Sequence, residues 1–473
     1  MNANSDDKPG HVDEQPEPFE EVNPHVVAYG NLVVSFSALS SRVKLLSREG
    51  SSLAFADVKS ARVVVGDVLG PPELRVAQRA QWQKRVGRLV FFGTELGDEQ
   101  AVPPESYVVG EQPWWRPAEW ERNVLANRGL RSQIRRAAAK GVQIRKLSDA
   151  ETAEGAPLRE AIRALMRQWL LGRQLAPMDF LLALRPFELR EFREYYVAER
   201  DGVLVGLLVS SPVFVSKARQ FEHLIRDLDA PNGTAEALID AAMRDAARAG
   251  TPEVTLGLCP LAGRVPAPLA WVRRMSRGMY DFSGLYAFKA KLQPHRWQRV
   301  LVEHPGQAAW RATLQVLRAF AGGNFLRFGM LSALRGPPPL IRAVAAVLLP
   351  WTLALACLDT GRWFPSPLVH AAWVCFDMLI AAGLFWLASR IQRRALRTWL
   401  HRTLAALITL DAFVTLAQAL LWNANRAQGS ADAILLAAAC IAPASVSVML
   451  WSSLSYRRRR CAEVSRTSAA MIF

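Results

Sequence analysis

The chain has 473 residues, a formal net charge of +16 and a mean hydropathy of +0.07. This length predicts at least two modules, and the positive charge predicts an acidic partner such as nucleic acid or anionic lipid. The sequence contains no G-x-S-x-G elbow, H-E-x-x-H pair, Walker loop or Rossmann fingerprint, which argues against the hydrolases, metalloproteases, NTPases and dehydrogenases that use them. Its five cysteines form no C-x-x-C pair, so we expect neither a disulfide framework nor a zinc site.

Residues 1–22 form an acidic leader with seven Asp or Glu residues and one Lys. This segment is too poor in apolar side chains to build a core, so we expect it to be disordered. It lacks the basic and then apolar pattern of a signal peptide. The domain that follows is therefore expected to stay in the cytoplasm.

Residues 23–310 contain the same order of expected elements twice. Strand patterns at 42–46, 52–56 and 61–68 precede an expected helix near 73–86 and a strand at 88–93. Strand patterns at 195–199, 203–209 and 219–226 likewise precede a helix and a strand at 254–258. We therefore expect an α/β (α+β) soluble region of two halves, 23–150 and 151–310, with a substrate cleft between them.

The expected helix of the second half begins after D-A-P-N-G-T at 229–234. Asn232 is the expected N-cap, Glu236 falls in the first turn, and Gly250 ends the helix. A strand-to-helix junction of this kind favours phosphate or carboxylate, which makes Asn232 and Gly233 candidate substrate-binding residues. A plain tight turn with a cap is the alternative.

Three further segments carry candidate site residues. On the strand R-Q-F-E-H-L-I-R, alternation places Glu222 and Arg226 on one face, as a catalytic pair or as a structural ion pair, whereas His223 is expected in the core. The segment G-L-Y-A-F-K-A-K-L at 284–292 reads as a strand, with Lys289 and Lys291 on one face for an acidic ligand or as a solvated edge. The helix 128–140 carries a basic face suited to phosphates, with simple solvation as the alternative; its candidate residues are Arg128, Arg131 and Arg135.

Four runs are long and apolar enough to cross a bilayer, at about 340–358, 367–388, 404–422 and 433–451. We expect an all-α transmembrane domain over 340–453, after a juxtamembrane linker at 311–339 and before a basic tail at 454–473. Arginines crowd the connector from Arg390 to Arg402 and the start of the tail at Arg457–Arg460. Positive charge marks the cytoplasmic side, so the soluble region and the C-terminus are both expected there. Asp377 and Asp411 lie inside spans, either as functional groups or as protonated helix-packing residues.

With these residues described, the soluble region resembles the C-terminal catalytic domain of phosphatidylglycerol lysyltransferases, the multiple peptide resistance factor family, over residues 25–310. Four motifs in the family's order carry the resemblance: G-D-V-L-G-P at 66–71, A-P-N-G-T at 230–234, L-G-L-C-P-L at 256–261 and G-L-Y-A-F-K-A-K-L at 284–292. Two features depart from the family. Family members commonly have an Asp close to the Arg on the strand before A-P-N-G, whereas here the run is F-E-H-L-I-R. The spans also follow the catalytic region instead of preceding it, so a flippase is not implied.

The resemblance implies a tandem GNAT-like domain in the bacterial cytoplasmic (inner) membrane. It also implies transfer of a lysyl or similar group from aminoacyl-tRNA to a glycerol hydroxyl of phosphatidylglycerol, an anionic phospholipid, without ATP, metal or other cofactor. Glu222, Arg226 and Lys289 would then be catalytic, and Asn232, Gly233, Lys291 and the three arginines of helix 128–140 would bind substrates. Two alternatives stay open: a GNAT-type acyltransferase with another donor or acceptor, and a non-catalytic protein that binds anionic lipid.

Overall fold

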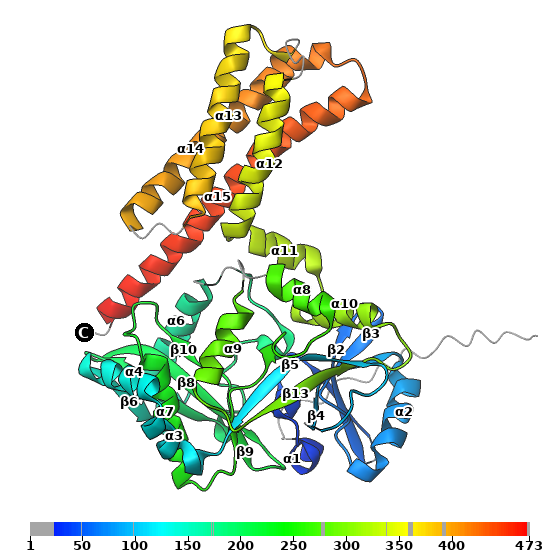
Figure 1. Cartoon of the computed structure of the whole chain (residues 1–473), viewed down its shortest axis with the longest axis vertical. Coiled ribbons are helices and arrows are strands. Elements are labelled where there is room, and N and C mark those ends of the chain that lie inside the picture. The colour runs from blue at the N-terminus through cyan, green and yellow to red at the C-terminus, as the bar shows by residue number, and fades with distance from the viewer. Residues whose placement is uncertain are drawn as a thin grey trace, which may run out of the picture.

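The structure is a computed structural model that describes residues 23–470 except 49, 98, 172, 174, 276–279, 337, 358–362 and 390–393. The side chains of 275, 394, 395 and 456–470 are likewise outside the description. The acidic leader, Arg390, Arg393 and the side chains of Arg457–Arg460 thus lie outside the described residues. Figure 1 shows a soluble α/β domain joined to a bundle of long helices.

One continuous 13-stranded sheet runs through the soluble domain. The strands that form it are β1 (Lys44–Arg48), β2 (Ser51–Val58), β3 (Ala61–Val65), β4 (Leu89–Leu96), β5 (Ser106–Trp115), β6 (Val142–Lys146), β7 (Glu194–Arg200), β8 (Val203–Val213), β9 (Ala218–Phe221), β10 (Ile225–Arg226), β11 (Val254–Thr255), β12 (Cys259–Pro260) and β13 (Arg296–Glu303). Their main order is β1-β2-β3-β4-β13-β5-β11-β9-β8-β7-β6, while β10 pairs with β8 and β12 with β5.

The repeated order expected from the sequence is present in the sheet. In the first half β3 and β4 are parallel and are joined through α2 (Arg75–Val86); in the second half β9 and β11 are parallel and are joined through α7 (Thr234–Arg248). The long strands β5 and β13 pair with each other, β13 also pairs with β4 and β5 also pairs with β11, so they connect the halves. Because β6 pairs with β7, we propose that residues before 150 already belong to the second half.

Helices cover both faces of this sheet. The remaining helical elements of the soluble domain are α1 (Pro24–Tyr29), η1 (Val33–Leu39), η2 (Pro72–Leu74), η3 (Pro117–Glu119), α3 (Trp120–Ala126), α4 (Arg128–Ala139), α5 (Asp149–Thr152), α6 (Pro157–Leu171), η4 (Phe180–Leu182), η5 (Arg190–Phe192), α8 (Ala267–Met275), α9 (Phe282–Lys291), α10 (Ala309–Phe320) and α11 (Phe325–Ala333). In the first half α2 covers one face and α10 the other; in the second half α4 and α7 cover one face and α6 the other. Trp115 and Trp120, at most 1% exposed, fill the core beneath α4 and α7, and Trp114 fills a smaller separate cluster.

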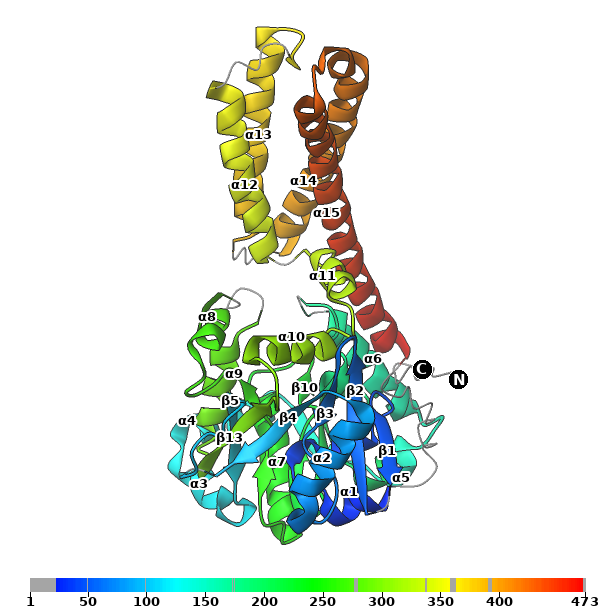
Figure 2. The same ribbon diagram turned by 90° about the vertical axis from the view of Figure 1, so that its right-hand side faces the viewer.

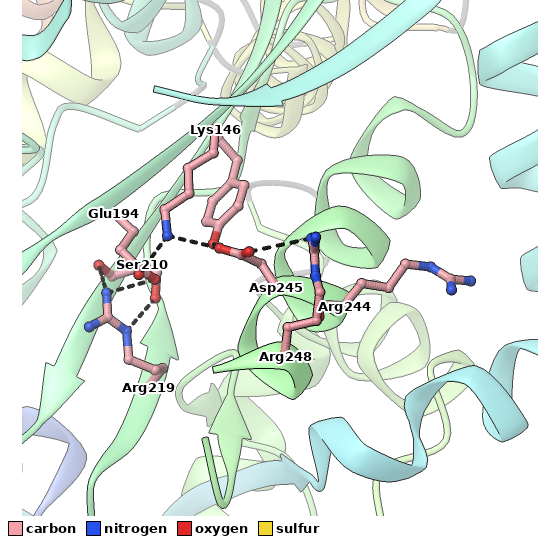
Figure 3. Close-up of polar contacts among 8 residues, drawn as sticks. Lys146, Glu194, Ser210, Arg219, Arg244, Asp245 and Arg248 are labelled. Carbon is pink, nitrogen blue, oxygen red and sulfur yellow. Dashed lines mark hydrogen bonds and ion pairs between the residues drawn. The ribbon is translucent and has the colours of Figure 1, made fainter. Parts of the chain in front are cut away.

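An ion-pair network fastens α7 to the edge of the sheet (Figure 3). The Lys146 Nζ atom on β6 lies 2.8 Å from both Asp245 of α7 and Glu194 of β7. The Tyr196 hydroxyl donates to the same Asp245 carboxylate at 2.6 Å, and Arg219 of β9 lies 3.0 Å from Glu194. Four elements are therefore held in register by charge as well as by their apolar faces.

Four helices follow that are long and apolar enough to span a membrane: Pro338–Cys357, Pro367–Leu387, Leu396–Arg426 and Ser430–Ser455. They correspond to α12 (Pro338–Cys357), α13 (Pro367–Leu387), α14 (Arg394–Gln418) with its short π and 3₁₀ extensions η8 (Ala419–Asn423) and η9 (Ala424–Arg426), and α15 (Ser430–Ala470). The four long apolar helices expected from the sequence are thus present. Figure 2 shows α15 continuing past the bundle to the soluble domain, where it packs against α6.

Candidate active site

A bulge breaks the strand that was expected to hold Glu222 and Arg226. Phe221 pairs with Ser210, and Ile225 pairs with Leu207. The four residue steps from 221 to 225 therefore lie opposite only three steps on β8, from 210 to 207. The extra residue reverses the alternation of side chains between the two positions. The prediction that Glu222 and Arg226 share one strand face is therefore wrong, and a local pattern could not reveal the bulge.

Glu222 is held instead by Ser211 of β8, by Arg193 just before β7 and by the adjacent His223. Its carboxylate lies 3.2 Å from Arg193 Nη2 and 3.9 Å from His223 Nε2, and it accepts a hydrogen bond from the Ser211 hydroxyl. The side chains of Arg193, His223 and Glu222 are only 7%, 11% and 15% exposed. The Glu222 amide still donates to the Val209 carbonyl at 2.9 Å, which fixes the backbone beside the bulge.

The protonation states of this cluster follow from burial and charge. Burial alone would raise the pKa of the Glu222 carboxyl, but His223, Arg193 and the Ser211 hydrogen bond together hold that pKa below its ordinary value. Burial lowers the pKa of His223, while the Glu222 charge opposes the shift and Arg193 adds to it. Since His223 is then neutral near pH 7, Arg193 and Ser211 are the partners that keep Glu222 charged.

The cluster lines a narrow cavity between the two halves of the domain. Its walls come from η1 of the first half, from the segment 180–193, and from Glu222 and His223 of the second half. The cavity measures about 20 Å³, which is room for roughly one water molecule. Any group larger than a water molecule therefore requires the walls to move apart.

Arg193 is a candidate site residue that no sequence pattern indicates. It lies just before β7, it lines the cavity, and its guanidinium stands 5.1 Å from the centre of the Phe36 ring. Its buried Nε atom has no hydrogen-bond acceptor among the residues that the structure describes. No motif marks this position, because its partner Glu222 is distant in the chain. The guanidinium thus keeps one donor for an anionic group in the cavity.

The other predicted residues of the second half form a separate group. Arg226 donates to the Ala230 carbonyl at 3.3 Å and so holds the turn before α7. Asn232 is exposed and is not the cap of α7: the N-cap is Gly233, which has a φ of 98°. A Cβ atom at Gly233 would lie 2.0 Å from the Gln133 carbonyl oxygen of α4. Because α4 covers this turn, the packing favours the plain tight turn over an anion site there.

The segment 284–292 is the helix α9, so the expectation of a strand with two parallel lysines is wrong. Asp281 caps this helix by accepting from the Gly284 amide, a local signal that lies just before the alternating pattern. Lys289 is 5% exposed, and its ammonium donates to the carbonyls of Leu256, Gly257 and Leu258 at 2.7, 2.8 and 3.2 Å. Burial lowers the pKa of Lys289 to about 8, with Cys259 opposing that shift.

Lys291 and the basic helix have different surroundings. Lys291 lies 3.0 Å from Glu236 in the first turn of α7, so it ties α9 to α7 and faces away from Lys289. The expected basic helix is α4, capped by Asn127 through the Leu130 amide. Arg128 and Arg135 are exposed and Arg131 is half-buried. None of the three makes an ion pair with any residue inside the described ranges, so all three remain available to phosphates.

A second and larger cavity of about 210 Å³ lies in the first half, beside the G-D-V-L-G-P motif. Arg79 crosses it, with Asp67 at 2.7 Å and Glu303 at 2.7 Å. Burial raises the pKa of Glu95 on the same wall, although Val33 and Gln112 donate hydrogen bonds to its carboxyl. The charged groups of this cavity largely pair with one another. In the described part of the chain no three His, Cys, Asp or Glu side chains are grouped as a metal ion requires.

Comparisons with known proteins place this geometry in context. Residues 125–302 match the family model of the C-terminal domain of phosphatidylglycerol lysyltransferase, which confirms the resemblance over that segment. No functionally curated protein matches the chain. Residues 125–302 contain β6 to β12, both parts of the bulged strand and the whole of α4, α7 and α9.

Two solved structures share the fold. The C-terminal domain of an Agrobacterium fabrum protein named as a lysylphosphatidylglycerol synthetase matches with a TM-score of 0.53 and 18% identity, over 64% of this chain and 98% of that chain. L-PGS from Bacillus licheniformis matches with a TM-score of 0.53 and 19% identity, over 66% of this chain and 98% of that chain. The expected fold class is thereby confirmed: a mixed α/β GNAT-like domain followed by four apolar helices.

Proposed function

We propose that this chain, whose residues 125–302 match the phosphatidylglycerol lysyltransferase family, transfers an aminoacyl group from aminoacyl-tRNA to a hydroxyl of an anionic membrane phospholipid. The observation that carries the proposal is the buried Arg193–Glu222–His223 cluster at the cavity between the halves. Glu222 is a charged base, His223 is a neutral base, and Arg193 has a hydrogen-bond donor that is not in use among the described residues. Phosphatidylglycerol is the acceptor that the family match favours, and lysine is the favoured amino acid.

The reaction is a transesterification, and its atoms balance without ATP or metal. The acceptor hydroxyl oxygen attacks the aminoacyl carbonyl carbon, and the bond from that carbon to the tRNA ribose oxygen breaks. The acceptor proton ends on the departing ribose oxygen. Glu222 or the vicinal ribose hydroxyl relays this proton, and neutral His223 beside Glu222 is a second acceptor for it.

Arg193 and Lys289 have different roles in this proposal. The Nε donor of Arg193 binds a lipid phosphate or the oxyanion that develops on the carbonyl. The Lys289 ammonium already serves three backbone carbonyls, so it acts as a positioning residue for the segment 256–258. Arg226 likewise positions the turn before α7. The proposed catalytic residues are therefore Glu222, His223 and Arg193. They replace the set Glu222, Arg226 and Lys289 that was expected from the sequence.

The two substrates suggest two surfaces. The exposed arginines of α4 suit the phosphates of tRNA, because Arg side chains that make no ion pair can each displace counterions from a nucleic acid. An acyl-CoA donor is disfavoured, since its pyrophosphate would need the junction before α7, where α4 already packs on Gly233. The basic connector and tail support a cytoplasmic active site at the inner face of the bacterial membrane.

A lipid assay tests the proposal directly. The full chain is expressed in a bacterium that lacks aminoacylated lipids, and the lipid extract is separated and stained with ninhydrin. We expect a new amine-positive phospholipid, whose mass identifies the amino acid and the acceptor. The test variant is Glu222→Gln, which should remove the spot if Glu222 relays the proton and leave it if the ribose hydroxyl does so. The matched control is Glu121→Gln at a 73% exposed position, which should leave the spot unchanged. No spot from a folded, membrane-inserted protein would reject the proposal.

A second assay separates the tRNA surface from the catalytic step. The triple substitution Arg128→Gln, Arg131→Gln and Arg135→Gln should weaken tRNA binding. It should also lower the slope of the logarithm of the binding constant against the logarithm of the salt concentration by about 2, because each phosphate contact contributes about 0.7 to 0.9 to that slope. The control replaces the exposed Arg116, Arg122 and Arg248 in the same way. Equal losses in both proteins would argue against a tRNA role for α4 but leave the lipid product as the test of the reaction.

A further inference from the structure

Three helices of the soluble domain carry large apolar side chains that the fold leaves exposed. On α10, Trp310, Leu314 and Leu317 are 61%, 48% and 50% exposed. Their spacing of four and three residues forms one stripe along the helix. The opposite face of α10 is also apolar, and it buries Ala312, Val316 and Ala319 in the core of the first half. The core therefore explains only one of the two apolar faces of α10.

Neighbouring helices extend this stripe. Leu326 and Met330 of α11 are 82% and 57% exposed, and Trp271 of α8 is 61% exposed. We call these six residues the membrane-side surface: Trp271, Trp310, Leu314, Leu317, Leu326 and Met330. Both Figure 1 and Figure 2 show α8, α10 and α11 on the side of the soluble domain that faces the helical bundle. Contiguous apolar patches of this kind mark a surface that is covered in use.

The charges of the same helices are all of one sign. Arginine occurs five times in α8, α10 and α11, and these helices contain no Asp or Glu: Arg273, Arg274, Arg311, Arg318 and Arg327. Arg311 stands 5.2 Å from the Trp310 ring centre, and Arg318 stands 5.5 Å from the Phe325 ring centre. Apolar stripes rimmed by arginine are characteristic of helices that lie in the headgroup layer of anionic membranes.

From the connection of these helices to the membrane spans we infer the occupant of the surface. The helix α11 ends at Ala333, and the first span begins at Pro338. In Figure 2, α10 lies across the long axis along which the bundle helices run. We propose that α8, α10 and α11 lie in the headgroup layer of the membrane that the four helices cross, with the membrane-side surface inserted among anionic lipids. The expected linker at 311–339 is then an interfacial element.

This arrangement has a consequence for the cavity between the halves. Phe320 at the end of α10 packs edge-on against Phe180 at 5.4 Å, and Phe180 lines that cavity. The interfacial helix therefore forms the layer next to the buried Glu222 cluster. The membrane placement itself does not depend on the proposed reaction, because it follows from exposure, charge and chain connection alone.

Site-directed fluorescence in vesicles tests the placement with the full chain. Cys357, Cys375, Cys440 and Cys461 are replaced by Ala, buried Cys259 is kept, and one environment-sensitive dye is attached at Leu326→Cys or Trp310→Cys. The matched control is Val76→Cys, at a position that is 84% exposed. It belongs to α2, a helix that lies farther from the bundle in both views. The proteins are reconstituted in vesicles of phosphatidylglycerol and phosphatidylcholine that carry nitroxide-labelled lipids.

We expect a blue-shifted emission and severalfold stronger quenching by the lipid nitroxide at positions 326 and 310 than at 76. Iodide dissolved in the water should quench a dye at position 76 more strongly than a dye at position 310 or 326. Equal behaviour at the three positions would overturn the proposal. Disulfide-linked pairs of chains formed by the unlabelled Leu326→Cys protein, together with no lipid quenching of the labelled one, would overturn it as well. Replacing phosphatidylglycerol by phosphatidylcholine should reduce the lipid quenching of a dye at position 326. Unchanged quenching would overturn the claim that the surface prefers anionic lipids.

Discussion

Arg193 and Glu222 form a buried ion pair of 3.2 Å at the junction of the two halves, although 29 positions separate them in the chain (222 − 193). Each side chain depends on the other, since neither is more than 15% exposed. An isolated charge at such a position is costly, whereas the paired charges compensate one another. The pair therefore fixes both the shape and the charge of the cavity.

The first prediction concerns this pair. Arg193→Met leaves the Glu222 carboxylate without its guanidinium and should lower the free energy of unfolding by about 3 kcal/mol or more. The double variant with Glu222→Gln should recover a large part of that loss, because no uncompensated charge remains. Thermal unfolding of the purified full chain in detergent measures both. Additive losses in the double variant would show that the two residues act independently.

The second prediction concerns pH and His223. Burial holds the pKa of this imidazole below its ordinary value of about 6.5. As pH falls through 6.5, the unfolded chain takes up the proton first, so the free energy of unfolding declines by up to about 1.4 kcal/mol per unit until the folded pKa is reached. His223→Gln should remove this decline. Melting temperatures of wild type and His223→Gln at pH 7.5 and 5.5 measure this decline. Equal decreases in the two proteins between these pH values would contradict the burial argument.

The third prediction concerns Lys289, whose pKa burial lowers to about 8. Against an unfolded value near 10.4, this shift costs about 3 kcal/mol of stability at neutral pH, and the cost disappears as pH rises from 8 to 10.4. The stability of wild type relative to Lys289→Met should therefore rise with pH across that window. Lys291→Met, whose side chain is 36% exposed in wild type, is the control and should show no comparable trend. A flat difference for Lys289→Met would refute the assignment.

The fourth prediction uses two glycines with positive φ. At Gly233 (φ +98°) an added Cβ atom would lie 2.0 Å from the Gln133 carbonyl oxygen. At Gly202 (φ +75°) an added Cβ atom would have no other atom within 4 Å. Gly202→Ala should cost about 1–2 kcal/mol, the strain of a left-handed backbone alone. Gly233→Ala should cost clearly more and separate α4 from α7. Similar melting temperatures for the two variants would mean that α4 does not pack on the turn.

Local patterns predicted much of the fold. Strands, the order around the crossover helices and the end of α7 near Gly250 (φ +69°) all follow from alternation, helical periodicity and glycine, which act over a few residues. The four spans follow from composition over about 20 residues, the thickness of a bilayer. Glu222 was predicted from a strand face that does not exist, yet the structure places it in the cavity cluster, and its catalytic role stays a prediction.

Tertiary structure decided the rest. Alternation at 284–292 suited a strand, yet Asp281 caps a helix there and the Lys289 ammonium reaches the carbonyls of segment 256–258. One extra residue between Phe221 and Ile225 separates Glu222 from Arg226 and leaves it beside Arg193. The sequence by itself determined most of the strands and helices and the four long apolar helices, because those preferences are local. Only the folded chain determined the partners of its buried charges, because such pairing depends on burial and register between segments far apart in the sequence.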